Sequence, residues 1–174
     1  MKRLVCLRRP VESIVLPMLE SRTMKAPLDA RGMLAVAIEQ ARIGLEEGGI
    51  PVGGAIFRTD GTLVSAGRNR LVQNGDPSMH GETDAFRAAG RQPHFRDLIL
   101  VTTLAPCWYC TGLIFQFRFK QVIVGDAVNA QGGSVWLREK GFDIVDVASA
   151  ECIDMMRKFK LAHPELWDEC IGDG

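Results

Sequence analysis

The chain has 174 residues, 47% of them hydrophobic and 24% charged, which is typical of a globular protein with one domain and a buried core. No apolar run reaches the ~20 residues that span a membrane, which excludes a membrane partner. Residues 1–31 carry seven Lys or Arg against three acidic residues, so the rest of this formally neutral chain has a net charge of −4. Nucleic-acid binding rests largely on phosphate neutralisation, so this balance favours a small molecule over a nucleic acid as the partner.

Residues 1–27 are predicted to be an N-terminal extension, and residues 28–174 to form the folded domain. The basic start and the apolar stretch at 11–19 resemble a signal peptide, but Glu12 and Pro17 interrupt it and no small-residue cleavage site follows. We therefore expect a flexible tail, or a segment upstream of the true start. The five cysteines favour a reducing compartment, the cytoplasm, over a disulfide framework.

The first elements predicted along the chain are a helix and a hairpin. Asp29 is a suitable N-cap for a helix whose apolar residues keep helical spacing, and Gly48-Gly49 ends it. Residues 52–58 and 62–67 have the pattern of two strands, and the Asp60-Gly61 pair between them is a strong hairpin signal.

The middle of the chain is predicted to contain two helices and a strand. The polar segment 68–79 is expected to be a loop, and a short helix follows over residues 80–89. Residues 98–104 form an apolar strand, after which Pro106 is expected in the first turn of the next helix, a position that proline favours.

Strands and helices are predicted to alternate in the last third of the chain. We expect strands at 122–125 and 142–147, helices at 134–140 and 149–159, and a tail over 165–174. Strands separated by helices indicate the α/β class, here a three-layer α/β/α sandwich with a five-stranded mixed sheet. The helix between the last two strands permits parallel pairing there.

The most informative motif joins His80-Gly81-Glu82 to Pro106-Cys107-Trp108-Tyr109-Cys110. One imidazole and two thiolates make three zinc ligands, and a zinc ion with three protein ligands keeps its fourth position for water. Glu82 is close enough to His80 to face that water and move its protons. A closed structural zinc site is the alternative, but it needs a fourth ligand, and the remaining cysteines and histidines form no second pair.

The predicted elements explain how these groups could meet. His80 and Cys107 each begin a helix, where the positive end of the helix dipole stabilises an anionic ligand. Cys107 and Cys110 are three residues apart, so both sulfurs lie on one face. Both the helix start and a metal ion would lower the pKa values of these thiols.

H-x-E followed by P-C-x-x-C is the signature of zinc-dependent nucleobase deaminases. Over residues 32–172 the sequence resembles the cytidine deaminase-fold proteins, and more narrowly the fungal-type cytosine deaminases. The resemblance is carried by 46–54, Asn69, 106–112, Val124-Gly125, Asn129 and the Trp-containing ending 164–172, an ending that tRNA adenosine deaminases lack. It implies a cytidine deaminase-like fold, a Zn²⁺ cofactor, a homodimer, and hydrolysis of cytosine to uracil and ammonia, as in pyrimidine salvage.

The resemblance also implies roles for particular residues. Glu82 would be the catalytic acid and base, beside a zinc ion held by His80, Cys107 and Cys110. The expected substrate-binding residues are Asn69, Gly81 and Trp167. Asn69 could instead be only a turn residue, and Trp167 only a core anchor for the tail.

Two positions differ from the fungal pattern. Cys170 stands where those enzymes have an aspartate that contacts the base, and Ala130 stands where they have an aromatic residue. A thiol cannot replace a carboxylate as a strong acceptor, and a lost contact of this kind changes substrate discrimination. Isocytosine, creatinine and guanine are therefore alternative substrates, followed by adenosine in tRNA or a non-catalytic zinc scaffold.

Overall fold

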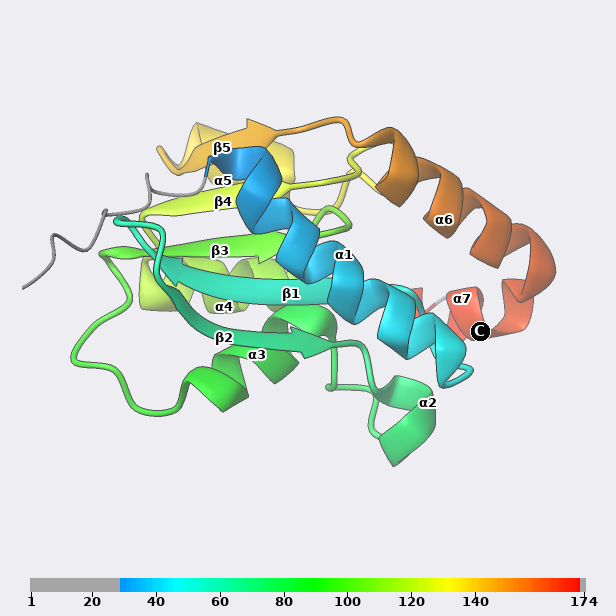
Figure 1. The fold of residues 1–174 in the computed structure, drawn as a ribbon. Helices are drawn as coiled ribbons and strands as arrows, with labels where there is room; N and C mark the ends of the chain where they lie inside the picture. The colour runs from blue at the N-terminus through cyan, green and yellow to red at the C-terminus, as the bar shows by residue number, and fades with distance from the viewer. Residues whose placement is uncertain (1–28, 173–174) are drawn as a thin grey trace, which may run out of the picture.

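The structure, a computed structural model, describes residues 29–172 (Figure 1). The predicted extension at 1–27 lies outside the described residues. In chain order the elements are α1 (Ala30–Glu46), β1 (Gly53–Arg58), β2 (Leu63–Arg68), α2 (Leu71–Asn74), α3 (Gly81–Ala89), β3 (Leu98–Thr102), α4 (Trp108–Phe117), β4 (Gln121–Val124), α5 (Ser134–Glu139), β5 (Asp143–Asp146), α6 (Ala150–Ala162) and α7 (Pro164–Ile171).

The five strands form one mixed sheet in the order β2-β1-β3-β4-β5. β1 pairs antiparallel with both β2 and β3, whereas β3, β4 and β5 are parallel to one another. The predicted hairpin is confirmed: the side chain of Asp60 accepts a hydrogen bond from the Thr62 amide at 2.9 Å, and Gly61 adopts a φ of 85°. Positive φ costs glycine little, so this pair suits the tight connection.

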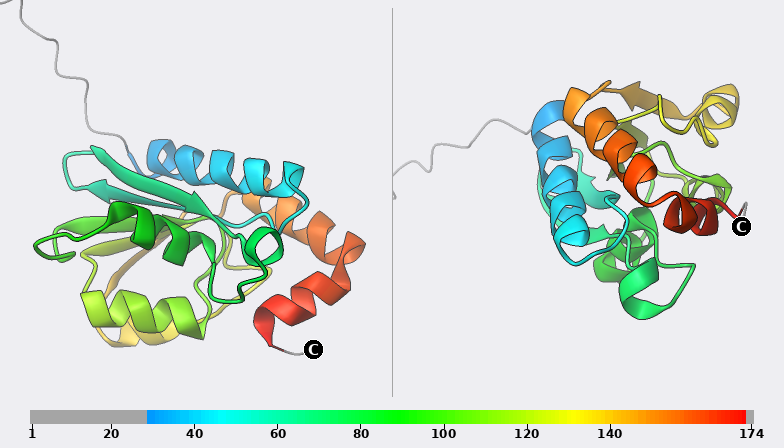
Figure 2. Two further views of the ribbon diagram at one scale, coloured as in Figure 1. Left: turned by 90° about the horizontal axis from the view of Figure 1, so that it is seen from below. Right: turned by 90° about the vertical axis from the view of Figure 1, so that its right-hand side faces the viewer.

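Helices cover both faces of the sheet, as Figure 2 shows (left view). On one face α1 and α6 pack against the inner side chains of β1, β3 and β4. On the other face α3, α4 and α5 pack against the alternate residues of the same strands. Side chains of successive strand residues point to opposite faces, so Ala55 and Phe57 contact the first layer and Ile56 the second. The predicted three-layer α/β/α sandwich is confirmed.

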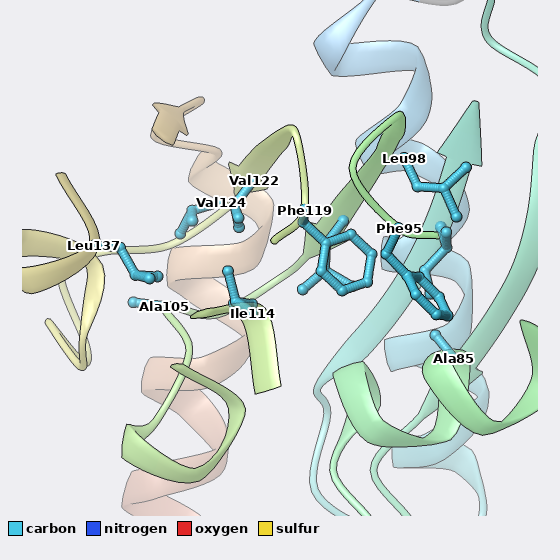
Figure 3. Close-up of a cluster of buried hydrophobic side chains, with 11 residues drawn as sticks. Ala85, Phe95, Leu98, Ala105, Ile114, Phe119, Val122, Val124 and Leu137 are labelled. Atoms are coloured by element: carbon cyan, nitrogen blue, oxygen red, sulfur yellow. The ribbon is translucent and has the colours of Figure 1, made fainter. Parts of the chain in front are cut away.

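The cluster on the α3–α5 side is shown in Figure 3. Ala85 from α3, Ile114 from α4 and Leu137 from α5 meet Leu100 and Val122 from the sheet, and all five are fully buried. Because both faces are covered, β3 is buried along its whole length, which explains its unbroken apolar sequence. Among residues 29–172, no helix has both the length and the apolar character needed to cross a membrane.

Three local expectations need correction. The loop predicted over 68–79 contains α2, a short helix held by the buried Leu71. Pro106 does not lie in the first turn of α4, because Cys107 is the N-cap and the helix begins one residue later. The predicted C-terminal tail is helix α7, which Pro164 opens at a position where its missing N–H is not needed.

Candidate metal centre and substrate pocket

The two ends of the zinc motif are the N-caps of two helices. His80 precedes α3 and Cys107 precedes α4, and each has an extended backbone, with ψ of 165° and 171°. The His80 amide donates to the Thr83 hydroxyl at 2.8 Å, which fixes the entry into α3. Cys110 is the third residue of α4 and is fully buried. The prediction that His80 and Cys107 begin helices is confirmed.

Glycines let the start of α3 lie directly on β1. A Cβ on Gly54 would be 2.4 Å from the Gly81 carbonyl oxygen, and one on Gly81 would be 2.9 Å from the Val52 carbonyl oxygen. A Cβ on Gly53 would collide with the α1 backbone at Ala37. The Gly53-Gly54 pair therefore serves tight backbone packing. Gly81 is buried in this contact, and its role as a substrate contact stays a prediction.

The three predicted zinc ligands lie together. His80 Nδ1 is 3.3 Å from the Cys107 sulfur and 3.6 Å from the Cys110 sulfur, and all three ligand atoms lie within 4.8 Å of one another. A tetrahedral zinc ion with ordinary Zn–N and Zn–S bonds separates its ligands by about 3.5–3.8 Å. The donor set therefore fits zinc. In the described part of the chain this cluster has no fourth member, as an open catalytic site requires.

The cluster is strongly polarised. A hydrogen bond from Cys110, together with the neighbouring His80, lowers the pKa of the Cys107 thiol to about 4. Burial favours neutral His80, but its contact with Cys107 and the charge of Glu82 raise its pKa above the ordinary value. The bond to Cys107 and burial raise the pKa of Cys110. A metal ion deprotonates coordinating thiols outright, so a bound cation would reverse that last effect.

Glu82 lies beside the cluster without belonging to it. Its side chain is only 3% exposed, and it lines the same pocket as His80 and Cys107. Burial, followed by the negative charge of Cys107, raises the pKa of its carboxyl above the usual value. A raised pKa makes the carboxylate a better proton acceptor, which favours a role in proton transfer.

His80 and Cys107 of the cluster line a pocket of about 800 Å³. That volume is in the range of cavities that bind small organic molecules. Residues of α6, α7 and the loop after β4 also line the pocket, and this part is called the far wall. The lining residues include Val52, Asn69, His80, Glu82, Leu104, Cys107, Trp108, Tyr109, Asn129, Ala130, Lys160, Trp167 and Cys170.

Asn69 and Trp167, predicted as substrate contacts, both line this pocket, and both also have structural contacts. The Asn69 side-chain oxygen accepts a hydrogen bond from the Leu71 amide at 3.0 Å, and its Nδ2 lies 3.9 Å from the Cys170 sulfur. Trp167 packs against a buried cluster that includes Leu104. Burial raises the pKa of the Cys170 thiol to about 12, which keeps it neutral. Asn69 is therefore a turn residue and Trp167 a core anchor, and both side chains also line the pocket.

The sequence analysis missed one residue that lines the pocket, Lys160, and one buried residue that supports a lining loop, Asp126. Lys160 lines the pocket from α6, and its position within the helix pattern did not distinguish it from a solvated lysine. Asp126, which is fully buried, fixes the loop after β4 by accepting hydrogen bonds from the amides of Val128 and Asn129. The turn pattern of an aspartate followed by an asparagine three residues later could have indicated that loop.

Comparison with known proteins places this site in a family. Residues 29–126 match the cytidine and deoxycytidylate deaminase zinc-binding region. The cytosine deaminase of Candida albicans is 41% identical over 147 residues, which covers 83% of this chain and 97% of that protein. A tRNA-specific adenosine deaminase of Buchnera aphidicola is 32% identical over 105 residues, or 59% of this chain and 68% of that protein.

A solved structure of the guanine deaminase from Nitrosomonas europaea shares the fold, with a TM-score of 0.63 and 19% identity over 79% of this chain and 87% of that one. The matched region contains the whole His80-Cys107-Cys110 cluster and Glu82. The predicted family and the zinc cofactor are thereby confirmed. This chain belongs to the family of zinc-binding cytidine and deoxycytidylate deaminases.

Proposed function

We propose that the protein hydrolyses the exocyclic amine of a free nucleobase, with cytosine as substrate and uracil and ammonia as products. The observation that carries this proposal is the placement of the buried Glu82 beside the His80-Cys107-Cys110 cluster, in a pocket that Asn69 also lines. The 41% identity to the Candida albicans cytosine deaminase supports the choice of cytosine.

The chemistry follows from the donor set and from Glu82. Zinc held by the cluster would supply a water molecule whose pKa is lowered toward neutrality. Glu82 accepts one proton from the attacking water and delivers it to the ring nitrogen beside the reacting carbon. It then transfers the second water proton to the amine, so ammonia departs and the ring carbon becomes a carbonyl. Its raised pKa suits this repeated protonation.

The pocket walls would orient the ring. Asn69 is 1% exposed, and within residues 29–172 the hydrogen-bond partner of its amide nitrogen is the distant Cys170 sulfur, so this nitrogen can donate to an acceptor on the base. The apolar side chains of Val52, Leu104 and Trp167 line the pocket and can cover the ring faces. Such a pocket combines an apolar lining with a few polar groups that fix orientation.

A larger ring such as guanine is the second candidate, because the pocket has space beyond a single six-membered ring. Ala130 is a small lining residue at the far wall, and the neutral Cys170 thiol is a weak hydrogen-bonding group. Isocytosine and creatinine fit the same argument. Adenosine in tRNA is less favoured because the body of the chain is acidic. A zinc scaffold would have no use for a buried carboxylate at the metal.

The test is ammonia release by zinc-loaded protein from cytosine, isocytosine, creatinine, guanine and adenosine, compared with Glu82→Gln. We expect turnover of cytosine, and a fall of about 10²–10⁴-fold in kcat for the variant with its zinc content unchanged, since general acid–base catalysis contributes that much. Glu139→Gln is a matched control, because Glu139 is exposed on α5 and does not line the pocket.

Two outcomes would contradict the proposal. If protein that contains one zinc ion per chain turned over no free base, deamination of a base would be the wrong reaction. If Glu82→Gln lost zinc together with activity, Glu82 would be a support for the metal site and not the proton carrier.

We propose further that the protein is a homodimer, as the family resemblance implies. Large apolar side chains are exposed on α4 and α5, with Trp108 67% exposed, Tyr109 53%, Phe117 40% and Val135 55%. Exposed apolar groups gathered on neighbouring elements favour a protein–protein contact. Sedimentation equilibrium should give twice the chain mass, and a monomer at micromolar concentration would exclude this assembly.

A further inference from the structure

Lys160 is a cation in the far wall of the pocket. It lies on α6, half-buried, with its Nζ 4.6 Å from the ring centroid of Trp167 on α7. The same nitrogen donates a hydrogen bond to the Asn129 carbonyl oxygen at 3.1 Å. Within residues 29–172 it forms no salt bridge. Its charge is therefore directed at a carbonyl group and at the face of an indole ring.

The Asn129 side of this contact is firmly held. The Asn129 amide donates to Asp126 Oδ1 at 3.0 Å, and its side-chain nitrogen donates to Asp126 Oδ2 at 2.7 Å and to the Ile153 carbonyl at 2.9 Å. Asp126 is fully buried at the end of β4. Charge-assisted hydrogen bonds of this kind are short and strong. The carbonyl that Lys160 contacts therefore has a fixed position relative to the sheet.

Helix α7, which carries Trp167, is held by fewer contacts. None of the side chains of α7 is fully buried, and Leu166, Trp167 and Cys170 pack against their apolar neighbours only in part. Among the described residues, the side-chain hydrogen bond from α7 to the rest of the chain is the long contact between Asn69 and Cys170, at 3.9 Å. The acidic residues of α7 form no salt bridge in that part of the chain. The cation–π contact with Lys160 is thus a main polar restraint on this helix.

We propose that Lys160 is a positioning residue that fixes Trp167 as a wall of the substrate pocket by tying it to Asn129. A half-buried ammonium over an indole is attracted to the negative ring face. Without that attraction, Trp167 would be in its pocket position in a smaller fraction of the protein molecules. The apparent affinity for substrate would fall by the same factor. Lys160 touches none of the reacting groups, so bound substrate would still be converted at nearly the normal rate. The inference rests on the proposed function only in taking this pocket as the substrate site.

The test compares Lys160→Met, which removes the charge and keeps an unbranched side chain one atom shorter, with Lys160→Arg, which keeps a positive charge and N–H donors. For Lys160→Met we expect KM for the base to rise about fivefold and kcat to change less than about twofold, as fits the loss of one cation–π contact. Hydrogen exchange of the α7 amides should accelerate by about the same factor while exchange in β3 is unchanged. Lys160→Arg should restore both. Lys158→Met is the matched control, because Lys158 is exposed on the same helix.

A second variant separates positioning from a general loss of stability. In a Trp167→Leu background the ring is absent, so adding Lys160→Met should change KM and α7 exchange little. Normal KM and normal α7 exchange in Lys160→Met would overturn the proposal, as would full additivity with Trp167→Leu. Hydrogen exchange is measured without substrate. It therefore tests whether Lys160 holds α7 in place even if no base in the panel is a substrate.

Discussion

The metal-binding side of the pocket and its C-terminal side differ in how each is attached to the sheet. His80 caps α3, whose first residue lies directly on β1, Cys107 caps α4, and Cys110 is fully buried. On the opposite side, α7 has no fully buried side chain and Trp167 is held from α6 by Lys160. The reacting groups are thus part of the core, whereas the groups that enclose the substrate are attached to its surface.

This difference separates chemistry from substrate choice. The two positions that depart from the fungal pattern, Ala130 and Cys170, both lie on the C-terminal side of the pocket. The metal ligands and Glu82 follow the deaminase signature without change. Substitutions on the metal-binding side should therefore abolish the reaction, and substitutions on the other side should mainly alter which base is bound and how tightly.

The strongest expected effect is that of Cys110→Ser. Loss of one thiolate from a three-ligand set should release zinc on dialysis and lower ammonia production by several orders of magnitude. Cys152→Ala is the control, since Cys152 on α6 is also buried but packs in the core with α1 and the sheet, away from the cluster. It should keep one zinc ion per chain by atomic absorption. Full zinc content in Cys110→Ser would mean that the cluster is not the metal site.

Gly54→Ala should be the most damaging change among those that leave the ligands intact. Its Cβ would meet the backbone of Gly81, which cannot move without displacing the start of α3, so we expect a loss of about 3 kcal/mol in the free energy of unfolding. Gly112→Ala has nothing within 4 Å of the new methyl group and should gain about 0.5–1 kcal/mol as a helical alanine. Urea unfolding measures both; equal effects would show that close backbone packing at Gly54 is unimportant.

Trp167→Leu should have the smallest effect on folding but a clear one on binding. We expect KM to rise about tenfold while the free energy of unfolding falls by only about 1 kcal/mol, because the ring is half-buried. Trp136→Leu is the matched comparison. Trp136 is also half-buried but packs 5.1 Å from the Phe115 ring, away from the pocket, so it should lower stability and leave KM unchanged. If KM were similar in the two variants, Trp167 would have no special role in binding, and the contrast between the two sides of the pocket would be wrong.

Much of the fold was predictable because its signals are local. The cap at Asp29, the turn at Asp60-Gly61 and the apolar run of β3 each encode an element within a few residues. The helix after Pro164 was missed because the sequence after a proline break shows only one short apolar face. The short helix α2 was missed because a single buried leucine, Leu71, stabilises it through tertiary contact.

In the candidate site, too, residues with a local sequence signal were predictable and residues placed by tertiary contacts were not. The metal ligands were predictable because zinc chemistry restricts both residue type and spacing, as His80, Cys107 and Cys110 show. Lys160 was not predictable, since its role depends on the distance from α6 to α7 and to the Asn129 loop. No spacing rule along the sequence encodes a distance between three separate segments.

The metal ligands come from two helix starts, the N-cap of α3 for His80 and the N-cap and first turn of α4 for Cys107 and Cys110. Neither helix start alone supplies the complete donor set, so the three-ligand site exists only when the fold brings both together. Once captured, the ion would act as a cross-link between segments 27 to 30 residues apart, resisting the separation of those two helix starts.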